Sequence, residues 1–299
     1  MQVADYIAAL RAEGPLLARA AERAGPGAPV PTCPGWRICD LVRHVGSVHR
    51  WAAGIVAEQQ AAPPGELTED EMVRSGPASD KDLPGWFLDG HQRLVAALEQ
   101  ADPGLTCWTF LAAPSPRAFW ARRQAHETAI HRVDAQLAEG TGAAGLDRLA
   151  PGLASDGIDE LIMGFGRRQS KRRLRSDPPC WLAVHARPGP GAPGSDGGYR
   201  PPGSDGGFSA PGGDGAPSGS GAVGGPADWV VRMGTDSAGV ARGVVPPDDV
   251  PGGTGCDLTG PAEALYLLLW NRGGTDGVEI SGDPRGLRVW REQVSVRWS

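Results

Sequence analysis

The chain has 299 residues and a formal net charge of −6, an acidic balance that argues against a nucleic-acid partner, which would select a basic face. It lacks a run of 18 apolar residues that could span a membrane, and its first residues lack the charge and apolar pattern of a signal peptide. Its five cysteines include no Cys-X-X-Cys pair, which favours buried, reduced thiols and a cytoplasmic location.

The first half of the chain predicts helices. Apolar residues at mostly helical spacing indicate helices over 3–24, 36–60, 85–101, 116–139 and 155–169. Ser115 and Pro116 supply an N-cap and a first-turn proline for the fourth of these helices. We interpret residues 62–84 as a loop with room for a short helix. Since no strand-like alternation occurs before residue 178, residues 1–170 predict an up-and-down helical bundle.

A basic stretch at 167–175 leads into the second half of the chain. Its arginines would suit a nucleic-acid patch, but a solvated linker between domains agrees better with the acidic total. We therefore assign residues 171–178 to a linker. The runs that follow are short and β-like, and two helices fit among them, so residues 179–299 predict a small α+β domain. The expected strands are 180–185, 229–233, 239–245, 256–258 and 278–280, and the expected helices are 261–271 and 283–293.

Glycine and proline are concentrated in one segment of this second domain. They make up 73 of the 299 residues, and 23 of them fall within the 42 residues 186–227. With almost no apolar side chains, this segment cannot offset the entropy lost on ordering, and we interpret it as a disordered insertion. A near-repeat containing one tyrosine and one phenylalanine leaves open whether it recruits a partner or is a tolerated expansion.

Two histidines and a glutamate form a candidate metal site. The run from His126 to His131 is one residue longer than the metalloprotease motif HExxH, so its two histidines lie about 140° apart on a helix and cannot easily hold one ion. Glu127 and His131 are four residues apart and face the same way, either as ligands or as an exposed pair that supports the helix. His44 lies on an apolar stripe, where a histidine is more often a buried hydrogen-bonded residue than a ligand. His49 lies about 140° from it, so only one of the two should face the site.

One histidine from the second predicted helix and the Glu–His pair of the fourth would supply three protein ligands. A zinc ion with three protein ligands and an open fourth position is the catalytic arrangement, and helical bundles build such sites from facing helices. The ligand types leave Zn²⁺, Ni²⁺ and Fe²⁺ as alternatives.

Several motifs resemble the mycothiol-dependent maleylpyruvate isomerase family. They are Thr32-Cys33-Pro34-Gly35-Trp36, the runs 40–45 and 120–135, and, toward the C-terminus, 258–272 and 280–283. The resemblance implies a DinB-like four-helix metal-binding domain followed by the C-terminal domain of that family. It implies His44, Glu127 and His131 as the ligands of a divalent metal ion, most simply Zn²⁺, with mycothiol as the thiol cofactor. It implies no particular substrate.

These features predict an enzyme, a mycothiol-dependent isomerase or a thiol transferase acting on a small electrophilic substrate, with acidic and neutral substrates both left open. The alternative is a metal- or thiol-binding protein without turnover. Arg272 is the candidate for binding a substrate carboxylate, and its alternative is a helix C-terminal arginine. Arg123 and Arg132 flank the metal face and are candidates for the anionic parts of the cofactor, or are simply solvated. Asp134, one turn past His131, is a candidate acceptor that orients this histidine. Either a monomer or a homodimer is compatible with the sequence.

Overall fold

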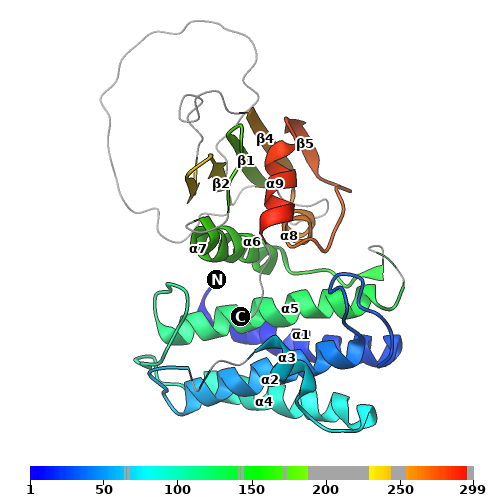
Figure 1. The fold of residues 1–299 in the computed structure, drawn as a ribbon. Coiled ribbons are helices and arrows are strands. Elements are labelled where there is room, and N and C mark those ends of the chain that lie inside the picture. Colours follow the sequence, from blue (N-terminus) through cyan, green and yellow to red (C-terminus); the bar gives the residue numbers. More distant parts are fainter. Residues whose placement is uncertain are drawn as a thin grey trace, which may run out of the picture.

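The computed structural model describes residues 1–63, 65, 68–140, 142, 145–170, 174–187, 229–243 and 254–294. Four long helices form a bundle in its N-terminal part (Figure 1). They are α1 (Val3–Ala24), α2 (Ile38–Ala57), α4 (Leu83–Gln100) and α5 (Pro116–Leu137). This arrangement confirms the helical bundle predicted from the apolar periodicity. The predicted N-cap of α5 is also present, since the Ser115 hydroxyl accepts a hydrogen bond from the backbone N–H of Ala118.

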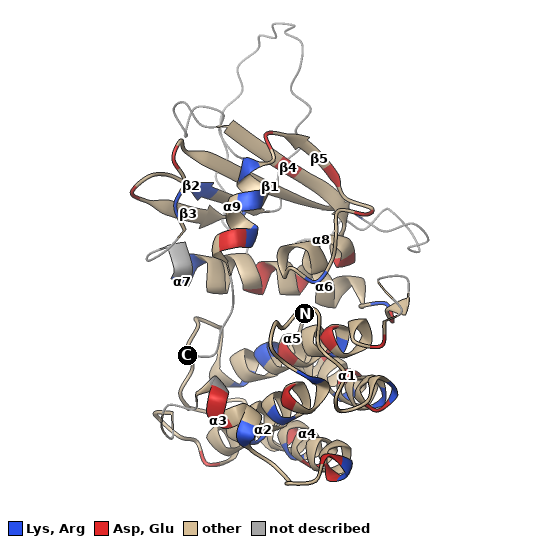
Figure 2. Cartoon of the chain, turned by 45° about the vertical axis from the view of Figure 1, so that its right-hand side comes forward, with Lys and Arg blue, Asp and Glu red and all other residues tan. Residues whose placement is uncertain are grey.

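The connection between α2 and α4 contains a short helix, α3 (Glu69–Arg74), and a single turn, η1 (Asp80–Asp82). Thr68 begins α3 with a capping box, in which its hydroxyl accepts from Glu71 N–H and the Glu71 carboxylate accepts from Thr68 N–H. Acidic and basic residues are interspersed along the bundle helices (Figure 2). Within the part of the chain that the structure describes, every helix is too short or too polar to cross a bilayer.

The C-terminal part contains a mixed five-stranded sheet with the order β3-β2-β1-β4-β5. Its strands are β1 (Cys180–Arg187), β2 (Trp229–Met233), β3 (Ala238–Ala241), β4 (Thr254–Pro261) and β5 (Glu279–Gly282). Only the central pair, β1 and β4, is parallel, and the other neighbours are antiparallel. Helices α8 (Ala262–Leu269) and α9 (Arg285–Gln293) contact both central strands. The predicted α+β class is therefore confirmed.

A helical layer lies between the bundle and the sheet (Figure 1). It consists of α6 (Pro151–Asp159), the π-helical segment η3 (Glu160–Gly166) and α7 (Arg167–Ser170). The fifth predicted helix falls here, and it contacts α8 and β3 rather than completing the bundle. Its apolar side chains join those of the bundle and of the sheet in one continuous core, which extends from Leu10 through Ile158 to Leu182. Leu174, within the predicted linker, is fully buried in the same core.

Part of the predicted organisation falls on residues that the structure does not describe. The proposed disordered insertion at 186–227 lies outside the described residues, apart from Ala186 and Arg187 at the end of β1. Residues 171–173 of the predicted linker and the end of the predicted strand 239–245 lie outside them as well.

Candidate metal centre

Helix α5 runs through the middle of the molecule and carries most of the candidate site. It contacts α1, α2 and α4, and nearly all of its residues are buried, including many polar and charged ones. A buried polar side chain needs a partner to offset its lost hydration. The charged and histidine side chains that α5 buries are arranged in ion pairs and hydrogen bonds, and the candidate site is part of that arrangement.

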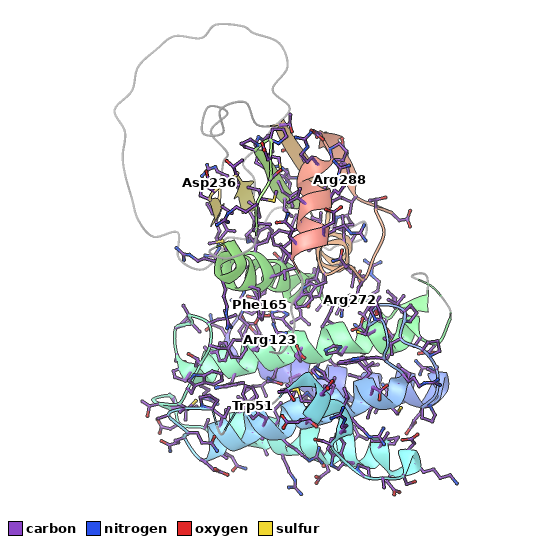
Figure 3. The ribbon with its side chains drawn as sticks, in the orientation of Figure 1. Trp51, Arg123, Phe165, Asp236, Arg272 and Arg288 are labelled. Atoms are coloured by element: carbon purple, nitrogen blue, oxygen red, sulfur yellow. The ribbon has the colours of Figure 1, made fainter. Side chains whose placement is uncertain are left out.

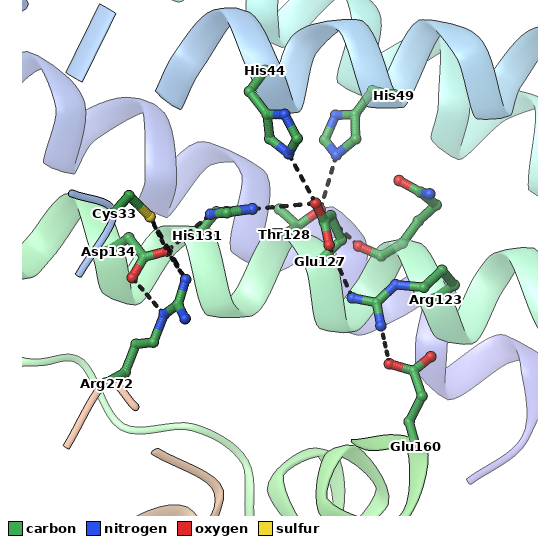
Figure 4. Close-up of polar contacts among 11 residues, drawn as sticks. Cys33, His44, His49, Arg123, Glu127, Thr128, His131, Asp134, Glu160 and Arg272 are labelled. Carbon is green, nitrogen blue, oxygen red and sulfur yellow. Dashed lines mark hydrogen bonds and ion pairs between the residues drawn. The ribbon is translucent and has the colours of Figure 1, made fainter. Parts of the chain in front are cut away.

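Three side chains converge where α2 crosses α5 (Figure 4). The Nε2 atom of His44 on α2 lies 3.2 Å from Oε1 of Glu127, and Nε2 of His131 lies 3.2 Å from the same oxygen. The ligand atoms of the three residues lie within 4.8 Å of one another, and all three residues are buried. Two imidazole nitrogens and one carboxylate oxygen directed at a common point are a donor set that fits Zn²⁺ or a similar divalent ion.

Attraction between the Glu127 carboxylate and the neighbouring imidazole and guanidinium groups stabilises this cluster. Burial by itself lowers the pKa of His131, but Glu127 and Asp134 outweigh it and raise this pKa to about 9. Burial alone would raise the pKa of Glu127, but His131, His44 and Arg123 hold it well below its usual range. The carboxylate is therefore ionised at neutral pH, which is the form that a metal ion binds.

The second nitrogen of His131 is held by an acceptor on the next turn of the helix. Nδ1 of His131 lies 2.9 Å from Oδ2 of Asp134, as expected for the acceptor predicted from the sequence. Arg272 donates from Nε and Nη2 to the two oxygens of Asp134, at 2.9 and 3.0 Å, and Thr32 donates its hydroxyl to Oδ1. Burial raises the pKa of Asp134, but Arg272 and His131 outweigh this and keep it below its usual range. Because Asp134 accepts from all of these groups, His131 is directed with Nε2 toward Glu127 and His44.

Cys33 lies beside this carboxylate, with Sγ 3.5 Å from Oδ2 of Asp134. Burial, followed by the negative charge of Asp134, raises the pKa of the Cys33 thiol above its usual value. A thiol whose pKa is raised stays protonated at neutral pH and is a poor nucleophile. The raised pKa favours the expected inert thiol, although Sγ lies within 4.8 Å of ligand atoms of His131 and Asp134.

The three arginines assigned to ligand binding all pair with protein carboxylates. Arg272 is bound to Asp134, so its guanidinium is already used by the protein. Arg123 pairs with Glu127 and Glu160 and is fully buried. Arg132 is also fully buried, and its hydrogen bonds go to Glu13, Gln136 and the carbonyl oxygen of Asp147. These contacts of Arg132 do not include the candidate ligands, and they give no support to its predicted cofactor contact.

The two other histidines considered as ligands in the sequence, His126 and His49, contact other residues. His126 contacts Oδ1 of Asp156 at 2.8 Å, consistent with the helical spacing that separates it from His131. Nε2 of His49 lies 2.9 Å from the Thr128 hydroxyl, which donates in turn to the Gln124 carbonyl. Burial and, after it, the neighbouring His91 lower the pKa of His49 well below its usual range. The structure thus brings His44, rather than His49, to Glu127.

One member of the arrangement is absent from the residues predicted by sequence. Glu160, the first residue of η3, pairs with Arg123 and so joins the chain of contacts that ends at Glu127. The only signal for it in the sequence was an acidic residue in the fifth predicted helix, 37 positions from its partner. No periodicity relates residues on two different helices, so this pairing depends on the fold.

Residues 7–136 match a family described as the mycothiol maleylpyruvate isomerase N-terminal domain, which confirms the resemblance found in the motifs of this part of the sequence. Two crystal structures of a mycothiol-dependent maleylpyruvate isomerase, one of them a mutant, are similar in fold. Their TM-scores are 0.56 and 0.53, each at 12% sequence identity and with 94% of this chain and 93% of the other covered. At that identity the likeness shows a shared fold. No curated protein sequence matches the chain significantly.

Proposed function

We propose that the protein is a metal-dependent enzyme that uses mycothiol on a small electrophilic substrate, because residues 7–136 match the mycothiol maleylpyruvate isomerase N-terminal domain family. The observation that carries the proposal is the convergence of His44, Glu127 and His131 in a buried cluster. The proposed reaction is an isomerisation or a thiol transfer, and Zn²⁺ is the proposed ion.

The three residues would hold the ion and leave a position open. A divalent ion bound there with the thiol would supply a thiolate nucleophile at neutral pH, whose addition and elimination isomerise an activated double bond, or whose addition alone gives a conjugate. The chain's own part is to hold the ligands in one geometry. Asp134 fixes the ring of His131 through Nδ1, and Arg123 holds Oε2 of Glu127 at 3.0 Å, so that Oε1 faces the two histidines.

The buried charges around the site support a single anionic ligand. Among the described residues, the ion pairs that Glu127, Asp134 and Glu160 make with arginines involve two guanidinium groups, those of Arg123 and Arg272. A divalent cation added to this set leaves one net positive charge, with the histidines neutral. Because an uncompensated buried charge is costly, the loaded site favours one further monoanion, and a thiolate meets that requirement.

Metal analysis of the purified protein and of three variants tests the assignment. We expect about one divalent ion per chain in the wild type and its loss in His44→Ala, Glu127→Ala and His131→Ala, since each substitution removes one of three ligands. His126→Gln is the matched control, because His126 is a buried, carboxylate-paired histidine on the same helix that lies outside the cluster. Metal content unchanged in Glu127→Ala and His131→Ala would overturn the site.

A panel of electrophiles, each assayed with and without mycothiol, tests the reaction. Turnover that depends on both the metal and the thiol supports the proposal. Metal binding with no thiol-dependent turnover of any electrophile would instead favour the metal- or thiol-binding protein without turnover. An unsaturated α-keto acid and a simple alkylating electrophile should both be included, because the first reports isomerisation and the second reports transfer.

A further inference from the structure

Arg123 is a fully buried guanidinium that joins two carboxylates from different parts of the chain (Figures 3 and 4). Its Nη2 donates to Oε2 of Glu127 at 3.0 Å, and its Nη1 donates to Oε2 of Glu160. The side chains of both glutamates are 3% exposed. Phe165 and Trp270 cover the guanidinium, with its central carbon 5.2 and 6.0 Å from the centres of their rings. Both rings lie within the range at which an aromatic face attracts a cation, so they stabilise the guanidinium in this position.

The position of Arg123 decides which oxygen of Glu127 faces the histidines. Oε2 is occupied by the guanidinium, so Oε1 is the atom directed at both Nε2 atoms. A metal ion at the cluster would be bound by the Glu127 carboxylate, whose negative charge also compensates the positive charge of Arg123. A buried guanidinium that shares its only counter-charge with a cation would be poorly compensated. Glu160 supplies a second counter-charge and removes that conflict.

Glu160 reaches Arg123 from an unusual piece of backbone. It is the first residue of η3, a π-helical segment of seven residues that follows directly on α6. Single π-helical turns are rare within helices and occur often at functional sites. The segment also carries Phe165, so it contributes both the counter-charge and part of the aromatic cover of Arg123. It lies beyond residue 136, where the match to the family ends.

We propose that Glu160 is a positioning residue, which acts through Arg123 on Glu127 and thereby sets the metal affinity of the centre. The inference rests on the proposed metal-dependent function, and it goes further by assigning control of the site to the π-helical segment outside the bundle. Outer-shell groups that orient a ligating carboxylate contribute about 10- to 100-fold to metal affinity in proteins. Glu160 lies one contact further out, so about tenfold is the effect we expect.

The test compares Glu160→Gln with Glu13→Gln. Glu13 is also a buried carboxylate paired with a fully buried arginine of α5, at 2.7 Å from Nε of Arg132, but that arginine contacts none of the three ligands. The Kd for Zn²⁺ is measured on each full-length variant by competition with a chromogenic chelator, and the absorption bands of the Co²⁺ form report the ligand geometry. Glu160→Gln should weaken Zn²⁺ binding about tenfold and shift the Co²⁺ bands, whereas Glu13→Gln should change neither.

Arg123→Lys provides a second measurement should Glu160→Gln fail to fold. Lysine keeps the charge but lacks the planar fork that holds two carboxylates at once, so it should weaken Zn²⁺ binding in the same way. Unchanged Kd and Co²⁺ spectra in the folded Glu160→Gln or Arg123→Lys protein would overturn the inference while leaving the proposed function intact. A wild type that binds neither ion would overturn both.

Discussion

Replacing Arg272 with alanine removes an ion pair between the C-terminal part of the molecule and α5, the helix that carries two of the candidate ligands. Arg272 follows α8 in the chain, and it donates to both oxygens of Asp134, at 2.9 and 3.0 Å. Asp134 is fully buried, and it also accepts from His131 at 2.9 Å. The substitution therefore leaves a buried carboxylate without its guanidinium partner and frees the group that orients His131.

The size of the effect follows from the burial of the pair. Removing one partner of a buried ion pair typically costs about 3–5 kcal/mol. The side chain of Arg272 is still 16% exposed, and Asp134 keeps the Thr32 hydroxyl, so the lower end, about 3 kcal/mol, is expected. That loss corresponds to a fall in Tm of roughly 5 °C for a chain of 299 residues, since the entropy of unfolding is about 2.1 cal/mol/K per residue. Metal affinity should fall about tenfold, because the carboxylate that orients a ligating histidine loses its own support.

Thermal unfolding of the metal-free protein measures the first effect, and chelator competition for Zn²⁺ measures the second. Arg23→Ala is the control, since Arg23 makes a similar two-fold contact to Glu139, at 2.8 and 2.7 Å, away from the ligands. It should leave the metal affinity unchanged. If Arg272 instead binds a substrate carboxylate, as its sequence context predicts, Arg272→Ala should raise KM and leave metal affinity and Tm unchanged. That outcome would refute the structural role of the Arg272–Asp134 pair.

Burial is the main reason that the pKa of His91 is lowered to about 4. Between about pH 6.5 and pH 4 the unfolded chain therefore binds a proton that the folded protein does not. The free energy of unfolding should fall by about 3 kcal/mol over that range. His91→Gln should lessen that loss in urea unfolding measured across the range, and an identical pH dependence would contradict it. Gly46→Ala would place a Cβ 2.3 Å from the Trp86 ring. The variant should lose about 1–3 kcal/mol of unfolding free energy in the same assay. A variant as stable as the wild type would show that the ring moves aside freely. The strands on either side of residues 188–228, β1 and β2, are adjacent and antiparallel, so a short Gly/Ser linker can join them. Replacing the segment with such a linker should preserve the metal content and the circular dichroism spectrum. Loss of either would contradict this prediction.

Local patterns in the sequence were enough to predict the helices of the bundle and two of the three candidate ligands. Helical periodicity located α1, α2, α4 and α5 within a few residues, because each buries one continuous set of apolar side chains. The four-residue spacing of Glu127 and His131 determined that they share a face, and the five-residue spacing of His126 and His131 separated those two. Such inferences hold because the geometry of a single helix relates nearby residues without any knowledge of the fold.

Contacts between separate elements were decided only by the tertiary structure. The wheel of α2 showed that His44 and His49 could not both face the site, but the crossing of α2 and α5 determined that His44 meets Glu127. Arg272 and Asp134 are 138 residues apart, and Arg123 and Glu160 are 37 apart. Sequence spacing carries no information about such distances, because the position of one element relative to another depends on how the whole core is filled. The ligand spacing on α5 is thus a property of the sequence, while the ion pairs that hold those ligands in place are a property of the folded chain.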